Sequence, residues 1–173
     1  MKAKTGQIDD WAERGLELAK LLQNSLLEAF VKESNRIEGI GMDDIAKDMA
    51  AHMAFLKLKN PGVADLQAFV SAVHPGALLR DKNGMDVRVG GHMPIGGGRL
   101  VPVALESMLE EIYGRRVSPY EAHVDYETLH PFTDGNGRSG RALWLWMVVR
   151  ETGQIPALGF LHSWYYASLG NGR

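Results

Sequence analysis

The sequence contains no cysteine among its 173 residues. This absence excludes disulfide bonds and thiolate metal sites, and it is typical of a reducing compartment, so we expect a cytoplasmic protein. No stretch approaches the roughly 18 apolar residues that a membrane span requires. The first residues, MKAKTGQIDDWAERG, also lack the apolar core of a signal peptide. We therefore expect no membrane partner.

An excess of charge of one sign is lacking too. The 19 Lys and Arg and the 21 Asp and Glu residues are mixed along the chain and leave a formal net charge of −2. Nucleic acids select strongly basic surfaces, so we expect no nucleic-acid partner. The 45% of hydrophobic residues suffices for one sizeable core. We expect residues 1–173 to form a single domain, and the sequence leaves oligomerisation open.

Apolar residues at helical spacing dominate most of the chain. The segment 136–152 is apolar nearly all round after Arg141, which predicts a helix at the centre of a bundle. We expect Asp9 or Asp10 to cap the first helical segment and Asp43 or Asp44 the second. The predicted helical segments are 9–37 (one or two helices), 43–59, 63–73, 102–113, 120–129, 136–152 and, as an aromatic helix or turn, 158–169.

The stretch from 82 to 103 breaks this pattern. It contains six glycines and two prolines, and the sequence Asp-Val-Arg-Val alternates polar and apolar residues. Such a composition predicts strands and turns rather than a helix. We expect a β-hairpin here.

The richest chemistry lies in His130 to Arg141, which reads HPFTDGNGRSGR. Pro131 and Gly135 break any helix, so the segment begins as a loop and ends where the helix from Asn136 starts. A helix N-terminus presents free N–H groups, and Gly135 and Gly137 lack a Cβ that would keep an anion away. The sequence therefore predicts a phosphate cradle made by residues 135–137.

Four charged or titratable side chains surround this cradle. Arg138 and Arg141 are three residues apart and share one helix face, where two guanidinium groups favour more than one phosphate. Asp134 is a lone carboxylate of the kind that helps hold a Mg²⁺ ion bound mainly by substrate oxygens and water. His130 can take up a proton near neutral pH.

These residues resemble the signature of the Fic family, HxFx(D/E)GNGRxxR, at every fixed position. The resemblance implies an all-α helical bundle with a small β-hairpin flap. It also implies a nucleotidyltransferase that uses Mg²⁺ and moves AMP from ATP onto a Ser, Thr or Tyr hydroxyl of a target protein. The target can be the enzyme itself. The resemblance implies that His130 is the base and Asp134 holds Mg²⁺. It also implies that residues 135–137 (Gly135, Asn136, Gly137) bind the α- and β-phosphates, Arg138 the β-phosphate and Arg141 the γ-phosphate.

Two other segments gain a role from the resemblance. In relatives the hairpin is a flap that pairs with the target, so His92 and Met93 either line that docking groove or are ordinary loop residues. Ser34, Glu38 and Gly39 match an inhibitory motif, (S/T)xxxE(G/N), within a helical segment of about 9–39. On the residues alone, SNRIEG is typical of a polar helix end followed by a glycine.

Three alternatives compete with this interpretation. The Doc-like branch of the family transfers a phosphoryl group, but it carries lysine where this chain has Gly137. A nucleotide-binding regulator without activity would have no evident use for His130. A zinc site on His123, Asp125, His130 and Asp134 would leave the arginines and glycines without a purpose.

Overall fold

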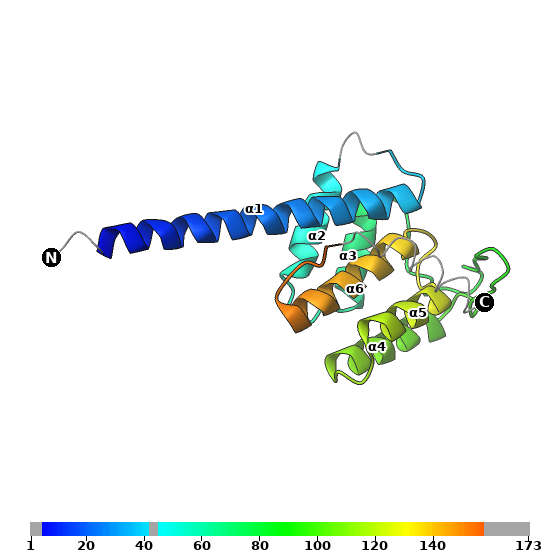
Figure 1. Cartoon of the computed structure of the whole chain (residues 1–173). Helices are drawn as coiled ribbons and strands as arrows, with labels where there is room; N and C mark the ends of the chain where they lie inside the picture. The colour runs from blue at the N-terminus through cyan, green and yellow to red at the C-terminus, as the bar shows by residue number, and fades with distance from the viewer. Residues whose placement is uncertain (1–4, 42–44, 158–173) are drawn as a thin grey trace.

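A computed structural model of the chain describes residues 5–41 and 45–157, with side chains from Arg14 onward. The predicted all-α fold is confirmed (Figure 1), because the described part of the chain forms six helices and no extended strand ladder. None of these helices is both long and apolar enough to cross a membrane. The helices are α1 (Thr5–Ile37), α2 (Ala46–Leu56), α3 (Val63–Val73), α4 (Leu100–Tyr113), α5 (Pro119–Leu129) and α6 (Asn136–Thr152).

Local signals define several helix ends. At the start of α5, Ser118 Oγ accepts a hydrogen bond from the Glu121 amide, while the Glu121 carboxylate accepts one from the Ser118 amide. This capping box, with Pro119 at the first helical position, starts α5 within one residue of the predicted position 120. Gly153 follows α6 with a φ of 72°, a conformation that glycine adopts without strain.

Other predicted boundaries were wrong. α1 begins at Thr5, so the expected caps Asp9 and Asp10 lie inside a helix that no proline interrupts. α4 begins at Leu100, two residues before Pro102, because a proline in the first helical turn loses no intrahelical hydrogen bond. α2 is shorter than expected, and its predicted caps, like the helix or turn of 158–169, lie outside the described residues.

α6 lies at the centre of the bundle and contacts α1, α2, α3 and α5. Its inward residues Leu143 and Trp146 join the main core, and Leu145 joins a second core with Leu27, Phe30 and Val31 of α1. The C-terminal half of α1 therefore packs across α6, while its N-terminal half extends beyond the bundle (Figure 1). This packing fixes the first turns of α6 relative to the end of α1.

The predicted β-hairpin is reduced to a tight turn. Within the described residues, Val89 and His92 form one isolated antiparallel bridge, with N–H···O distances of 3.0 and 2.9 Å. Gly90 takes a positive φ of 57° at the turn, and Pro94 cannot donate to a ladder. The segment also ends at Arg99 rather than 103, because α4 starts earlier. We call residues 82–99 the flap.

Candidate active site

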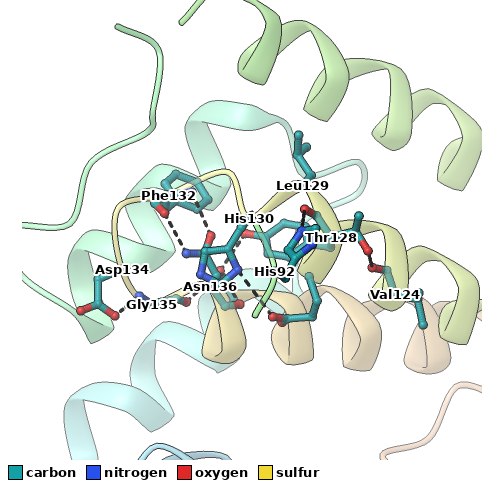
Figure 2. A network of polar contacts seen from close by, with 12 residues as sticks. His92, Val124, Thr128, Leu129, His130, Phe132, Asp134, Gly135 and Asn136 are labelled. Atoms are coloured by element: carbon teal, nitrogen blue, oxygen red, sulfur yellow. Dashed lines mark hydrogen bonds and ion pairs between the residues drawn. The ribbon is translucent and has the colours of Figure 1, made fainter. Parts of the chain in front are cut away.

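The loop between α5 and α6 is held in shape by one side chain. Asn136 Oδ1 accepts a hydrogen bond from the Phe132 amide, and Asn136 Nδ2 donates to the Phe132 carbonyl, both at 2.8 Å (Figure 2). Asn136 is buried, and Phe132 is fully buried beneath the loop. The Asn136 side chain is thus committed to the loop, which leaves its backbone N–H to contribute to the predicted cradle.

His130 stands at the other end of this loop. It ends α5 with φ 49° and ψ 63°, a left-handed conformation that costs a non-glycine residue roughly 1 kcal/mol. Strain of this kind is often retained where a side chain must point in a required direction. Here the left-handed residue ends α5 at the loop that leads to α6.

Burial lowers the pKa of His130, and the nearby Arg80 and His92 lower it further. The backbone of Glu127 and the Asp134 carboxylate act in the opposite direction but are smaller in total. Glu127 also places its Oε2 3.9 Å from His130 Nδ1. The imidazole is therefore neutral at pH 7 and able to accept a proton.

The first turn of α6 adjoins this imidazole. By helix geometry, the N–H groups of Asn136, Gly137 and Arg138 have no acceptor within the helix, and they carry the positive end of the dipole. The space above Gly137 holds an anion of the protein itself, because a Cβ at this position would overlap Glu38 Oε1. The cradle therefore accommodates a carboxylate oxygen close to the backbone.

Arg141 binds the same carboxylate. Its Nη2 donates to Glu38 Oε1 at 2.6 Å, its Nε donates to Ser34 Oγ at 2.9 Å, and Nη2 also reaches the Ser34 carbonyl at 3.0 Å. Ser34 and Arg141 are buried. The structure thus brings the two ends of the SNRIEG segment onto an arginine more than a hundred residues away.

The helix end itself is also a polar cap, as its sequence suggests. Gly39 follows α1 with a φ of 68°, and its amide donates to the Arg36 carbonyl at 3.1 Å. Asn35 is buried, and its Nδ2 donates a hydrogen bond of 2.6 Å to Oδ2 of Asp48, which lies in the first turn of α2. The two interpretations of this segment are compatible, because the glycine ends the helix where Glu38 reaches α6.

Arg138 reaches a residue that the sequence analysis missed. Its Nη1 donates to the Val73 carbonyl at 2.7 Å, and its Nη2 lies 3.0 Å from His74 Nδ1. A guanidinium can only donate, so Nδ1 accepts and the His74 proton resides on Nε2. That nitrogen lies 3.4 Å from Asp134 Oδ2. His74 therefore bridges the predicted phosphate ligand Arg138 and the predicted metal ligand Asp134.

Asp134 fits a Mg²⁺ ligand of the predicted kind. Its carboxylate is 65% exposed at the mouth of the cradle, and Oδ1 accepts a hydrogen bond from the Gly135 amide at 2.6 Å (Figure 2). No group of three or more acidic, His or Cys side chains among the described residues could hold a metal alone. A single exposed carboxylate suits an ion whose other ligands are phosphate oxygens and water.

The alternative zinc ligands do not come together. His123 is buried inside the bundle, and burial lowers its pKa to about 4. Asp134 lies on the exposed loop instead. His123 is therefore a packed side chain of the bundle rather than a metal ligand.

The two flap residues predicted to dock a target differ in their surroundings. His92 Nε2 donates to the Thr128 carbonyl of α5 at 2.9 Å (Figure 2), and its charge influences His130. Met93 is 63% exposed. The flap turn thus lies against the end of α5, with an apolar side chain open to solvent beside it.

Three residues around the site escaped the sequence analysis: His74, Arg80 and Glu127. His74 precedes a proline and resembled a simple helix end, while Glu127 resembled a solvated helix position. Only Arg80 carried a signal, because an arginine after Ala-Leu-Leu interrupts an apolar run. The partners of His74 and Arg80, which are Arg138, His130 and the flap, are distant in sequence, whereas Glu127 lies three residues before its partner His130.

Comparisons with known proteins bear on the family and the fold. Residues 65–148 match the model of the Fic/DOC family. A Fic family protein from Desulfovibrio desulfuricans G20, solved by crystallography, is similar to this chain with a TM-score of 0.53 and 20% sequence identity, over 82% of this chain and 53% of that one. The chain thus spans about half the length of that protein, and the likeness shows the fold. A comparison with curated proteins found no match.

Proposed function

We propose, from the premise that residues 65–148 of this chain form a Fic/DOC family domain, that the protein transfers AMP from ATP to a hydroxyl side chain of a protein. The observation that carries the proposal is a neutral imidazole, His130, next to an anion cradle that already holds a carboxylate. A site that holds one carboxylate oxygen against Gly137 and on Arg141 suits a phosphate oxygen equally well. The target is another protein or a second region of this chain.

The chemistry follows from these positions. His130 takes the proton of the target hydroxyl, and the oxygen then attacks the α-phosphorus. The bond from that phosphorus to the bridging oxygen breaks, and pyrophosphate leaves. The amides of residues 135–137 and the guanidiniums of Arg138 and Arg141 stabilise the charge on the phosphate oxygens. Asp134 would hold Mg²⁺, which supplies further charge neutralisation when bound.

Arg138 must serve this reaction with its remaining donors. Two of its nitrogens are held by Val73 and His74, so its plane is fixed before any nucleotide arrives. A guanidinium has five N–H groups, and the unused ones are those that a β-phosphate can take. His74 then orients both this arginine and Asp134.

We also infer that α1 restrains the enzyme. Glu38 occupies the space above Gly137 and pairs with Arg141, the arginine expected to hold the γ-phosphate. A triphosphate that enters while Glu38 stays must bind without that arginine and so adopts a poor alignment for in-line attack.

Label transfer tests the activity. The purified protein, incubated with Mg²⁺ and ATP labelled at either the α- or the γ-phosphate, should incorporate only the α-label. His130→Ala should lose that incorporation while ATP affinity stays within a few-fold, since the imidazole acts on the hydroxyl. Incorporation of the γ-label would instead support the Doc-like phosphoryl transfer. Nucleotide binding with neither label incorporated, also in Glu38→Gly, would support a regulator.

A further inference from the structure

Arg80 is the largest side chain in the fully buried part of the core. It follows α3 and lies outside the nucleotide site described above. Its guanidinium donates to four backbone carbonyls: His130 through Nε at 2.7 Å, Leu129 through Nη2 at 2.9 Å, and Ile95 and Met85 through Nη1 at 2.9 and 3.3 Å. Four of its five N–H groups thus hold main-chain atoms.

These carbonyls belong to two separate parts of the site. Leu129 and His130 form the C-terminal end of α5, where helix carbonyls lack intrahelical donors and carry the negative end of the dipole. Met85 and Ile95 lie at the two sides of the flap. The backbone of Arg80 adds two more bonds, since its amide donates to the Pro131 carbonyl and its carbonyl accepts from the Gly98 amide, both at 2.9 Å.

We infer that Arg80 is a positioning residue that fixes the flap at a set distance from His130, so that a target seated on the flap presents its hydroxyl to the imidazole. This inference rests on the proposed function. A planar guanidinium suits the task because its fork spans acceptors on opposite sides, whereas a lysine ammonium is a single point of donation. The left-handed backbone of His130 is held by the same fork.

The consequence for the reaction is geometric. A displacement of about 1 Å between reacting groups can cost on the order of a hundredfold in rate. Arg80→Lys keeps the positive charge but cannot bridge the flap and α5 together. We expect kcat for AMP transfer to fall about 10- to 100-fold while KM for ATP changes less than about threefold, because ATP contacts residues 134–141 rather than Arg80.

A perturbation of the flap tests the coupling directly. A Cβ on Gly97 would lie 2.6 Å from the Met85 carbonyl oxygen, so Gly97→Ala must displace an acceptor of Arg80. Gly91→Ala, also in the flap, is the control, since a Cβ on Gly91 would have nothing within 4 Å. Both substitutions are made in the full chain with Arg80 and with Arg80→Lys, and the His130 amide and ring resonances are recorded by NMR.

With Arg80 present, Gly97→Ala should shift the His130 resonances and lower kcat, whereas Gly91→Ala should leave both unchanged. In the Arg80→Lys background, Gly97→Ala should add little to either effect, which is the signature of coupling in a double-mutant cycle. Equal responses in the two backgrounds, or a folded Arg80→Lys variant with wild-type kcat, would overturn the inference. Should Arg80→Lys not fold, unchanged His130 resonances in Gly97→Ala overturn it instead.

The NMR measurement separates this inference from the proposed function. If no variant, Glu38→Gly included, transfers AMP, the proposed activity is wrong, yet the His130 resonances still report whether the flap is coupled to α5. If transfer occurs and Gly97→Ala leaves His130 unmoved, the activity stands and the role of Arg80 is wrong.

Discussion

Replacing Glu38 with glycine removes the carboxylate that lies against Gly137 and Arg141 in the predicted phosphate cradle. The substitution frees Arg141 Nη2, which donates to Glu38 Oε1 at 2.6 Å, and opens the space above Gly137. Ser34 still accepts from Arg141 Nε, so the arginine stays near its present position. Glu38 lies just after the last residue of α1, where glycine costs little helix stability, so the loss of the pair with Arg141 dominates and we expect the free energy of unfolding to fall by about 1–2 kcal/mol.

The size of the effect follows from two contributions. A hydrogen bond to a charged group is worth roughly 1.5–3 kcal/mol. Because the Glu38 side chain is 37% exposed, solvent screening lowers the expected strength of its contact with Arg141 to about 1–2 kcal/mol. That corresponds to about a 5- to 30-fold gain in access of a triphosphate to Arg141. Correct alignment for in-line attack contributes up to about a hundredfold more. We expect Glu38→Gly to raise AMP transfer by at least about tenfold.

The assay measures initial rates of label incorporation from α-labelled ATP into this protein and into added target protein. Glu33→Gly is the control, because Glu33 lies five positions earlier on α1 and pairs with Arg36, whose side chain is 48% exposed. The double variant Glu38→Gly, His130→Ala shows how much label is not catalytic. Equal rates for the wild type and Glu38→Gly, with the fold intact, would refute the autoinhibition.

Three further predictions concern the ion and the titrating groups. Asp134→Asn should lower AMP transfer and raise the Mg²⁺ concentration needed for half-maximal rate; an unchanged Mg²⁺ titration of the rate would remove Asp134 from the metal site. Because burial lowers the pKa of His130, the rate of Glu38→Gly should rise with pH through a midpoint below 6.5, and a midpoint above 6.5 would contradict this. Burial lowers the pKa of His52 and of His123 to about 4. As the pH falls, these histidines therefore take up protons in the unfolded chain before they do so in the folded protein. The free energy of unfolding should thus drop between pH 6.5 and 4 by on the order of 3 kcal/mol for each histidine. Urea unfolding of His52→Gln across that range should show a shallower decline, and an unchanged slope would rule out His52.

The sequence by itself determined the features that depend on neighbouring residues. The capping box of Ser118 and Glu121 defines the start of α5, and Gly153 defines the end of α6. The loop that joins these helices follows from Pro131 and Gly135, because neither residue continues a helix. The start of α5, the end of α6 and the loop between them could therefore be predicted, since the forces responsible act within a few residues.

Tertiary structure alone decided which distant side chains meet. Ser34 and Glu38 reach Arg141 because Leu27, Phe30 and Val31 pack α1 across α6 at Leu145, and no local rule sets that packing. His74 and Arg138 are 64 residues apart, and Arg80 and His130 are 50 apart. Such pairs depend on how whole helices pack and on the entropy of closing long loops, which the order of residues in any one segment does not reveal.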